Sequence, residues 1–133
     1  MRLSPVLTVL AVLLVASVAL AKTTGSANIT SLGSSGISGT ADFAITGNGV
    51  VKVHESLSGL TPGVQYQSFG YSNSTSCGSG GTRALIQTFT ANAAGKANLN
   101  LLAPLQVSPV DAFSSVSVQL AGDPAILACG EIQ

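Results

Sequence analysis

The sequence predicts an antiparallel all-β fold, a sandwich or flattened barrel of seven or eight strands. Short runs of alternating apolar and polar residues recur roughly every 10 to 14 residues, with glycine-rich turns between them. After the first 21 residues, no window keeps the apolar period of an amphipathic helix. Turn residues are abundant and charged residues make up only 8% of the chain. This combination is typical of an exported β protein.

The amino-terminal segment has the features of a secretory signal peptide. Arg2 supplies the positive charge, residues 5–20 are almost wholly apolar, and Ala19 and Ala21 are the small residues before a cleavage site. The apolar run is shorter than the roughly 20 residues that span a bilayer, although an uncleaved anchor is the alternative. We therefore expect residues 1–21 to be removed and residues 22–133 to form one secreted domain, extracellular or periplasmic, with no membrane span.

Each expected strand is a short run that ends at a turn signal. Asn48-Gly49 favours a hairpin turn, Pro62-Gly63 favours a tight turn, and residues 92–95 are expected to close a hairpin. The expected strands are residues 27–32, 39–46, 50–57, 64–71, 83–91, 96–102, 115–120 and 124–132. The expected core residues on them are Ala41, Phe43, Ile45, Val51, Val53, Leu60, Val64, Tyr66, Phe69, Leu85, Phe89, Leu99 and Leu101.

The charge and the cysteine content of the chain exclude several classes of function. The chain carries five basic and five acidic residues, so neither nucleic acid nor an anionic membrane has a basic surface to bind. The two cysteines, Cys77 and Cys129, form no metal-binding or redox motif. In an exported chain an even number favours one disulfide over two free thiols. A disulfide between Cys77 and Cys129 would close a loop of about 50 residues and would stabilise the folded state by roughly 4 kcal/mol.

Three stretches, taken in order, carry a resemblance to a known family. They are residues 39–63 (GTADFAITGNGVVKVHESLSGLTPG), residues 90–101 (TANAAGKANLNL) and residues 127–132 (LACGEI). Together with Cys77 in the loop after the fourth expected strand, they resemble the copper/zinc superoxide dismutases. The resemblance implies a Greek-key sandwich of eight strands, and it implies that Cys77 and Cys129 form the family's intrasubunit disulfide.

The same comparison implies that the family's catalytic residues are missing. Where the family has the histidine-rich segment HGFHVHE, this chain has residues 64–69 (VQYQSF). Leu85 stands at the place of the zinc aspartate, Gln119 at that of a copper histidine, and Ile126 at that of the arginine that guides superoxide. We therefore expect no catalytic residue, no metal ligand and no cofactor, and expect that the chain is not an enzyme.

The single histidine, His54, leads to the same expectation from the residues alone. A redox copper site needs several imidazoles, and one histidine cannot supply them. We expect His54 to be a solvent-facing strand residue beside Glu55; adventitious metal binding with Asp42 or Glu55 is the alternative. No hydrolase motif, paired-carboxylate arrangement or phosphate loop accompanies it.

Two further groups of residues are candidates for surface functions. Asn28 and Asn73 begin N-glycosylation acceptor tripeptides, which would be used only in a eukaryotic host. The strand and loop over residues 64–81 are the expected binding loop, with Gln65, Tyr66, Gln67 and Tyr71 as its contact residues. Core packing is the alternative for the tyrosines.

These observations favour a secreted, non-catalytic superoxide dismutase-like domain that acts as a binding or structural module. Its expected partner is an unidentified extracellular protein or surface ligand, and a homodimer is left open. One alternative is a metal-dependent superoxide dismutase, completed by ligands from a partner. Another is a cell-surface or matrix protein that associates with itself through sheet edges.

Overall fold

The computed structural model describes residues 24–45, 51–72, 77, 82–103 and 113–133. The expected signal peptide and the Asn48-Gly49 turn lie outside these residues. The eight strands are β1 (Thr24–Ser31), β2 (Ser38–Ile45), β3 (Val51–Ser58), β4 (Gln65–Ser72), β5 (Thr82–Thr90), β6 (Ala97–Ala103), β7 (Ser115–Leu120) and β8 (Ile126–Glu131). The prediction of an antiparallel all-β fold is therefore confirmed. Within the described residues no helix is long and apolar enough to cross a bilayer.

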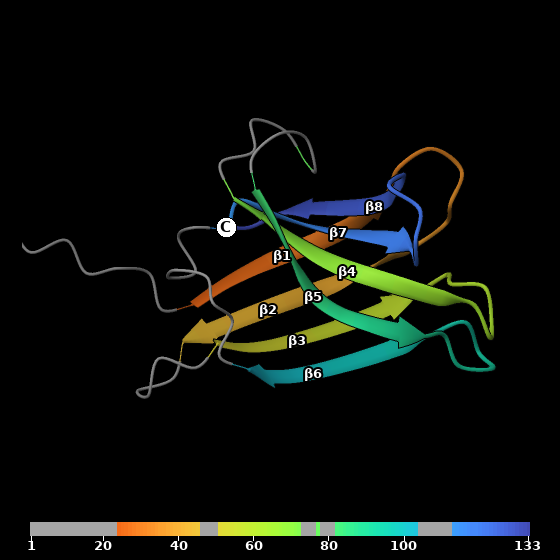
Figure 1. Cartoon of the computed structure of the whole chain (residues 1–133), viewed down its shortest axis with the longest axis horizontal. Helices are drawn as coiled ribbons and strands as arrows, with labels where there is room; N and C mark the ends of the chain where they lie inside the picture. Colours follow the sequence, from red (N-terminus) through yellow and green to blue (C-terminus); the bar gives the residue numbers. More distant parts are fainter. Residues whose placement is uncertain (1–23, 46–50, 73–76, 78–81, 104–112) are drawn as a thin grey trace, which may run out of the picture.

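The strands form a nearly closed, flattened barrel in the order β5-β4-β7-β8-β1-β2-β3-β6 (Figure 1). We call β1, β2, β3 and β6 the first sheet, and β8, β7, β4 and β5 the second sheet. The two sheets are joined where Thr30 and Ser31 of β1 pair with Cys129 and Ala128 of β8. Every ladder is antiparallel, so each sheet presents one face to the interior and one outward.

The expected hairpin between residues 83–91 and 96–102 is only partly correct. Its turn is present, because the amide of Asn92 donates to the carbonyl of Lys96 at 2.9 Å. Beyond the turn, however, β5 pairs with β4, and β6 pairs with β3. The two strands separate into opposite sheets because each finds a longer ladder with another strand. As a result, β5 and β6 are the two ends of the sheet order.

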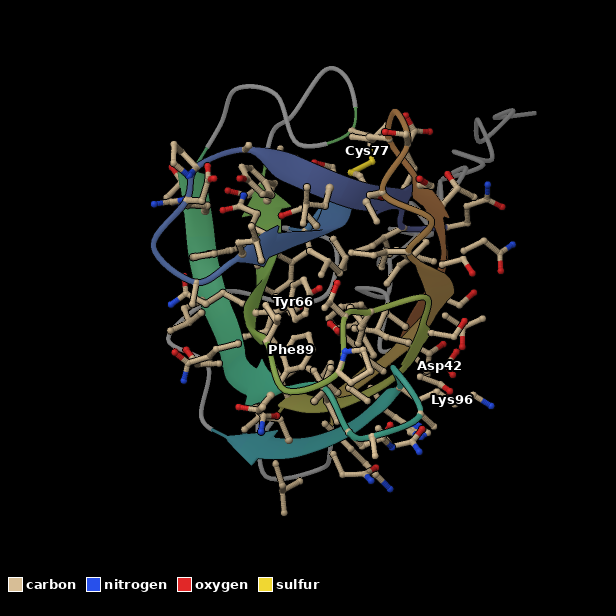
Figure 2. All side chains as sticks on the ribbon, turned by 90° about the vertical axis from the view of Figure 1, so that its right-hand side faces the viewer. Asp42, Tyr66, Cys77, Phe89 and Lys96 are labelled. Atoms are coloured by element: carbon tan, nitrogen blue, oxygen red, sulfur yellow. A yellow bond between two sulfur atoms is a disulfide. The ribbon has the colours of Figure 1, made fainter. Side chains whose placement is uncertain are left out.

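The core lies between the two sheets and consists of alternate residues of the strands. Figure 2 shows Tyr66 and Phe89 inside the barrel, whereas Asp42 and Lys96 point away from it. The rings of Tyr66 and Phe89 are stacked, with centroids 5.9 Å apart. The buried apolar cluster comprises Ile29, Ile37, Ala41, Phe43, Val51, Val53, Leu57, Leu60, Tyr66, Ile86, Phe89, Ala91, Ala97, Leu99, Val116, Val118 and Ala128.

An irregularity in β5 changes which residue faces this core. Ser68 pairs with Gln87 and Phe69 pairs with Leu85, so Ile86 is an extra residue in the ladder. Ile86 consequently enters the core, while Leu85 is 46% exposed. The expectation that Leu85 lines the core is therefore wrong. Alternation alone does not reveal an inserted residue.

A glycine is required where the turn before β4 approaches the turn before β2. Gly59 has φ of 75°, in the left-handed region, and a Cβ there would overlap the backbone of Gly36. The phenolic oxygen of Tyr66 accepts a hydrogen bond from the amide of Thr61 at 2.9 Å. This contact ties the same turn to the core and holds the start of β4 in place.

Candidate binding surface

The outer face of the second sheet carries three side-chain hydrogen bonds between its strands among the described residues. Antiparallel ladders place directly opposed residues side by side on one face. Along the strands, three rows of neighbours result: Thr88-Gln67-Gln119, Leu85-Phe69-Ser117 and Arg83-Tyr71-Ser115. We call these nine residues the β4–β5–β7 face. It brings together side chains that are far apart in the sequence.

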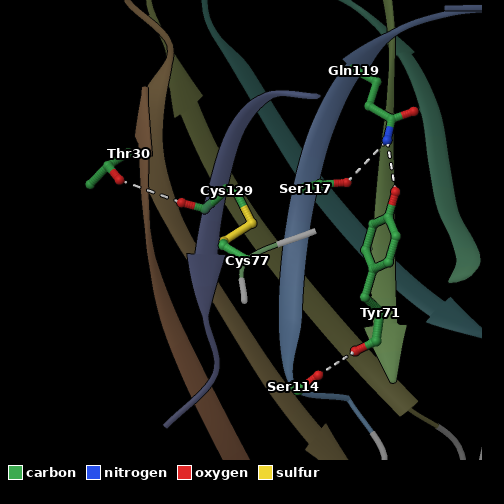
Figure 3. Close-up of a disulfide and its surroundings, with 7 residues drawn as sticks. All are labelled: Thr30, Tyr71, Cys77, Ser114, Ser117, Gln119 and Cys129. Atoms are coloured by element: carbon green, nitrogen blue, oxygen red, sulfur yellow. Dashed lines mark hydrogen bonds between the residues drawn. A yellow bond between two sulfur atoms is a disulfide. The ribbon is translucent and has the colours of Figure 1, made fainter. Parts of the chain in front are cut away.

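Gln119 makes three of the side-chain hydrogen bonds on this face. Its side chain is only 1% exposed although it points outward from β7. Its Nε2 donates to the hydroxyl of Tyr71 at 2.9 Å and to Oγ of Ser117 at 3.5 Å (Figure 3). Its Oε1 accepts a hydrogen bond from Arg83 at 3.4 Å. The carboxamide is thus satisfied at both ends, as a buried polar group must be.

Arg83 covers the neighbouring part of the face. Its guanidinium carbon lies 4.5 Å from the centre of the Phe69 ring, a cation–π distance. Because its Nη1 also bonds to Gln119, the guanidinium is held over β4 and β7 while the residue itself remains exposed. Phe69, expected in the core, is instead buried on the outer face beneath this side chain.

A small concave site of about 150 Å³ opens beside Arg83. Its walls are Gln67, Arg83, Gln119, Gly122, Asp123 and Pro124. The side-chain Nε2 of Gln67 donates to Oγ1 of Thr88 at 3.3 Å, and this hydrogen bond orients the Gln67 side chain. The site therefore combines a guanidinium, two carboxamides and a carboxylate, groups that recognise polar or charged side chains of a partner.

The disulfide lies on the same side of the sheet. Cys77 is bonded to Cys129, which confirms the prediction from the two cysteines. Figure 3 shows this bond on β8, and Ser117 of the neighbouring β7 is paired with Cys129 in the ladder. The disulfide anchors Cys77, which follows β4 in the sequence, to the last strand beside Ser117 of the β4–β5–β7 face.

The expected contact residues of the binding loop are divided between two environments. Gln65 is exposed, Gln67 is half-buried and Tyr71 is buried on the outer face with its hydroxyl bonded to Gln119. Tyr66 is 3% exposed and lies in the core, so it supports the sheet rather than a binding surface. Cys77 apart, the structure describes nothing of residues 73–81, the second half of that loop.

Of the two glycosylation candidates, one lies within the described residues. Asn28 is exposed on β1, beside Thr40 in the ladder. It borders a concavity of about 300 Å³ that includes the disulfide. Asn73 lies outside the described residues. The geometry makes Asn28 accessible, and its modification stays a prediction.

His54 lies on the outer face of the first sheet, opposite Asp42 and next to Lys52 along the strand. These three residues line a groove of about 680 Å³. Throughout the part of the chain that the structure describes, no group of three His, Cys, Asp or Glu residues gathers closely enough to hold a metal ion.

The donors on the β4–β5–β7 face do not fit a redox copper site. The nitrogen and oxygen of Gln119 are a neutral amide already engaged in hydrogen bonds, and Gln67 offers a second amide. Copper that cycles between oxidation states prefers imidazole and sulfur ligands. Tyr71 and Ser117 supply hydroxyl groups instead.

Sequence reasoning missed two functional-looking residues. Arg83 is expected only as a strand residue, and Glu55 as a neighbour of His54 and, in the alternative, its partner in adventitious metal binding. Glu55 is completely buried, and burial raises its pKa to about 7, partly offset by a hydrogen bond from Ser68. The alternation of β3 does contain the signal for Glu55, because it shares a face with Val53 and Leu57. No local signal predicts the contact of Arg83 with Phe69.

No family model matches the chain, and no curated protein is significantly similar to it in sequence.

Proposed function

We propose that this chain is an exported, non-catalytic domain of the superoxide dismutase-like fold, acting as a binding or structural module. The β4–β5–β7 face is its proposed binding surface. The partner we expect is an extracellular protein or surface ligand with polar or charged side chains. The observation that carries the proposal is Gln119, a buried amide whose both ends are engaged where the resemblance expects a copper ligand.

The order of the strands supports the resemblance. In the sheet order, β7 returns to pair with β4 although β5 and β6 stand between them in the sequence. A fourth strand that returns beside the first of three consecutive strands is a feature of a Greek key. The bond between Cys77 and Cys129 agrees with the disulfide that the resemblance implies.

Export is supported by the disulfide and by the apolar leader in the sequence. A disulfide forms and persists in oxidising compartments, outside the cytosol. Mass spectrometry of the protein released into the medium or periplasm tests this directly. We expect the mature chain to begin at Lys22; a chain that retains residues 1–21 would contradict export by cleavage.

Comparing two variants tests the binding surface. The double variant Gln67→Ala/Arg83→Ala removes two walls of the small concave site. Thr40→Ala, exposed on the outer face of the first sheet, is the matched control. We expect partners captured by cross-linking to the wild type to be lost by the double variant and kept by the control. Equal capture by all three proteins would refute the proposed surface.

The enzyme alternative is separated by metal analysis and a superoxide-decay assay. We expect no stoichiometric copper in the purified mature chain and no catalysed decay of superoxide. Stoichiometric copper together with turnover would replace the binding-module proposal with the dismutase alternative. Repeating the assay with captured partner present tests whether ligands from a partner complete a site.

Self-association is the second candidate function, favoured by one observation. No ladder joins β5 to β6 among the described residues, so these strands retain backbone groups able to pair with another strand. Sedimentation equilibrium distinguishes the cases. A monomer across the micromolar range contradicts self-association, whereas a concentration-dependent dimer supports it.

A further inference from the structure

The interior of the barrel contains a polar cluster that the proposed function does not use. Glu55 projects inward from β3 and is completely buried. Ser68 of β4 is also completely buried, and its Oγ donates to Oε1 of Glu55 at 2.6 Å. Gln87 of β5 is directly opposite Ser68 in the ladder, so its side chain lies on the same face. The hydrogen bond between Ser68 and Glu55 therefore connects the two sheets, and Gln87 lies beside Ser68 on the neighbouring strand.

The surroundings of Glu55 are apolar. Its ladder neighbours are Ala41 of β2 and Leu99 of β6, and Val53 and Leu57 flank it on its own strand. All four of these residues are buried. An ionised carboxylate in such surroundings loses its hydration without gaining a cation.

No charged group from the packed elements faces Glu55 within the described residues. On the inner faces of the barrel, the only other titratable side chain that the structure describes is Tyr66 of β4, whose hydroxyl bonds to Thr61. The charged residues of β2 and β3, together with the imidazole, lie on the opposite face of the sheet: Asp42, Lys52 and His54. Arg83 of β5 lies on the outer face of the second sheet.

A count of donors and acceptors shows what the cluster needs. Ser68 provides one hydroxyl donor, which Oε1 of Glu55 accepts. Oε2 of Glu55 and Oε1 of Gln87 are buried acceptors without a hydrogen-bond partner among the described residues. A carboxyl group that keeps its proton is itself a donor as well as an acceptor. With Oε1 as the buried end of the Gln87 amide, one proton on Glu55 supplies a donor for these two acceptors.

We propose that the cluster is a proton-operated latch, in which the protonated carboxyl of Glu55 donates to Oε1 of Gln87 and links β3, β4 and β5. The rise of the pKa of Glu55 to about 7 by burial supports this protonation. When the proton is lost, Oε2 of Glu55 and Oε1 of Gln87 are two acceptors without a donor between them. The link to β5 is then broken and the strand is released. β5 is the strand that responds because it ends the sheet order and, among the described residues, has a ladder only with β4.

Amide hydrogen exchange along β5 tests the latch. After correction for intrinsic exchange, we expect exchange of these amides to accelerate on the order of 30- to 100-fold between about pH 5 and pH 8. Glu55→Gln, a neutral isostere of the protonated form, should abolish this acceleration. Glu131→Gln, at an exposed position on β8, is the matched control and should behave as the wild type. Acceleration that persists in Glu55→Gln would overturn the proposal.

Titration of the wild-type carboxyl by carbon NMR gives a test that needs no variant. We expect a midpoint near pH 7. A midpoint near that of an exposed glutamate, the outcome if a buried water supplies the missing donor, would overturn the latch.

Two variants then separate the partners. Ser68→Ala should raise the midpoint, because the hydroxyl stabilises the ionised form. Gln87→Leu should lower it, because the protonated form loses its acceptor. An unchanged midpoint in Gln87→Leu would show that Gln87 does not receive the proton and would overturn the proposal.

Discussion

The guanidinium of Arg83 lies 4.5 Å above the ring of Phe69 and donates to Gln119, so one side chain of β5 contacts both β4 and β7. Arg83→Ala removes both contacts. We expect it to lower the free energy of unfolding by about 1 kcal/mol, because the residue is exposed and its hydrogen bond is long.

Urea denaturation measures this loss, with Thr40→Ala as the control for an exposed strand position. Arg83→Lys keeps the charge but loses the planar guanidinium, and should recover at most part of the loss. Full recovery in Arg83→Lys would show that charge alone matters and that the contact with Phe69 is incidental.

Removing the disulfide should destabilise the domain strongly. The bond joins residues separated by 52 positions, and a loop of that size is worth about 4 kcal/mol in the chain-entropy account. The double variant Cys77→Ser/Cys129→Ser should therefore lose most of the stability of a small domain. Its urea midpoint should match that of reduced wild type. A free energy of unfolding within about 1 kcal/mol of that of oxidised wild type would contradict this prediction.

Gly70 should tolerate no side chain. A Cβ at this position would overlap the ring of Phe113, which also contacts Phe43 with centroids 6.0 Å apart. We expect Gly70→Ala to cost about 1 to 3 kcal/mol through overpacking.

The double variant Gly70→Ala/Phe113→Leu checks the cause. It should be less destabilised than the sum of the two single variants, because the smaller side chain leaves room for the methyl group. Strict additivity in thermal or urea unfolding would show that the ring is not what excludes the side chain.

The free energy of unfolding should fall as the pH rises from about 4.5 to about 7. The pKa of Glu55 in the folded chain is about 7, above its ordinary value of 4.5, so the folded state binds more protons in this interval. Stability due to this group is complete below the lower value and is lost as pH rises through the upper one. The shift corresponds to about 3 kcal/mol. Urea unfolding at pH 5 and pH 8 measures it, and a flat profile contradicts it.

Chelation should leave the stability of the purified protein unchanged. A metal bound to the folded state stabilises it by mass action, and its removal would lower the melting temperature. Because the β4–β5–β7 face offers amides and hydroxyls rather than imidazoles, we expect no shift when a strong chelator is added. A lowered melting temperature that copper or zinc restores would contradict this expectation.

The alternation of apolar residues was sufficient to predict the class of fold and most of the strands. The expected strand over residues 115–120 coincides with β7, and Phe43, Val53 and Leu99 lie in the core as expected. The disulfide followed from having two cysteines in a chain that the sequence predicts to be exported. These features depend on local pattern and composition, which a single sequence contains.

Tertiary structure alone decided which strands pair and which polar groups meet. β5 and β6 share a turn yet belong to opposite sheets. Because Ile86 is an extra residue in the ladder of β5, its side chain is buried in the core and that of Leu85 is exposed. Glu55 meets Ser68 only because the two sheets pack face to face. Alternation determines the side of a strand on which a residue lies. The residues that it contacts on that side belong to distant segments of the chain. How those segments pack is determined by burial of the apolar core as a whole.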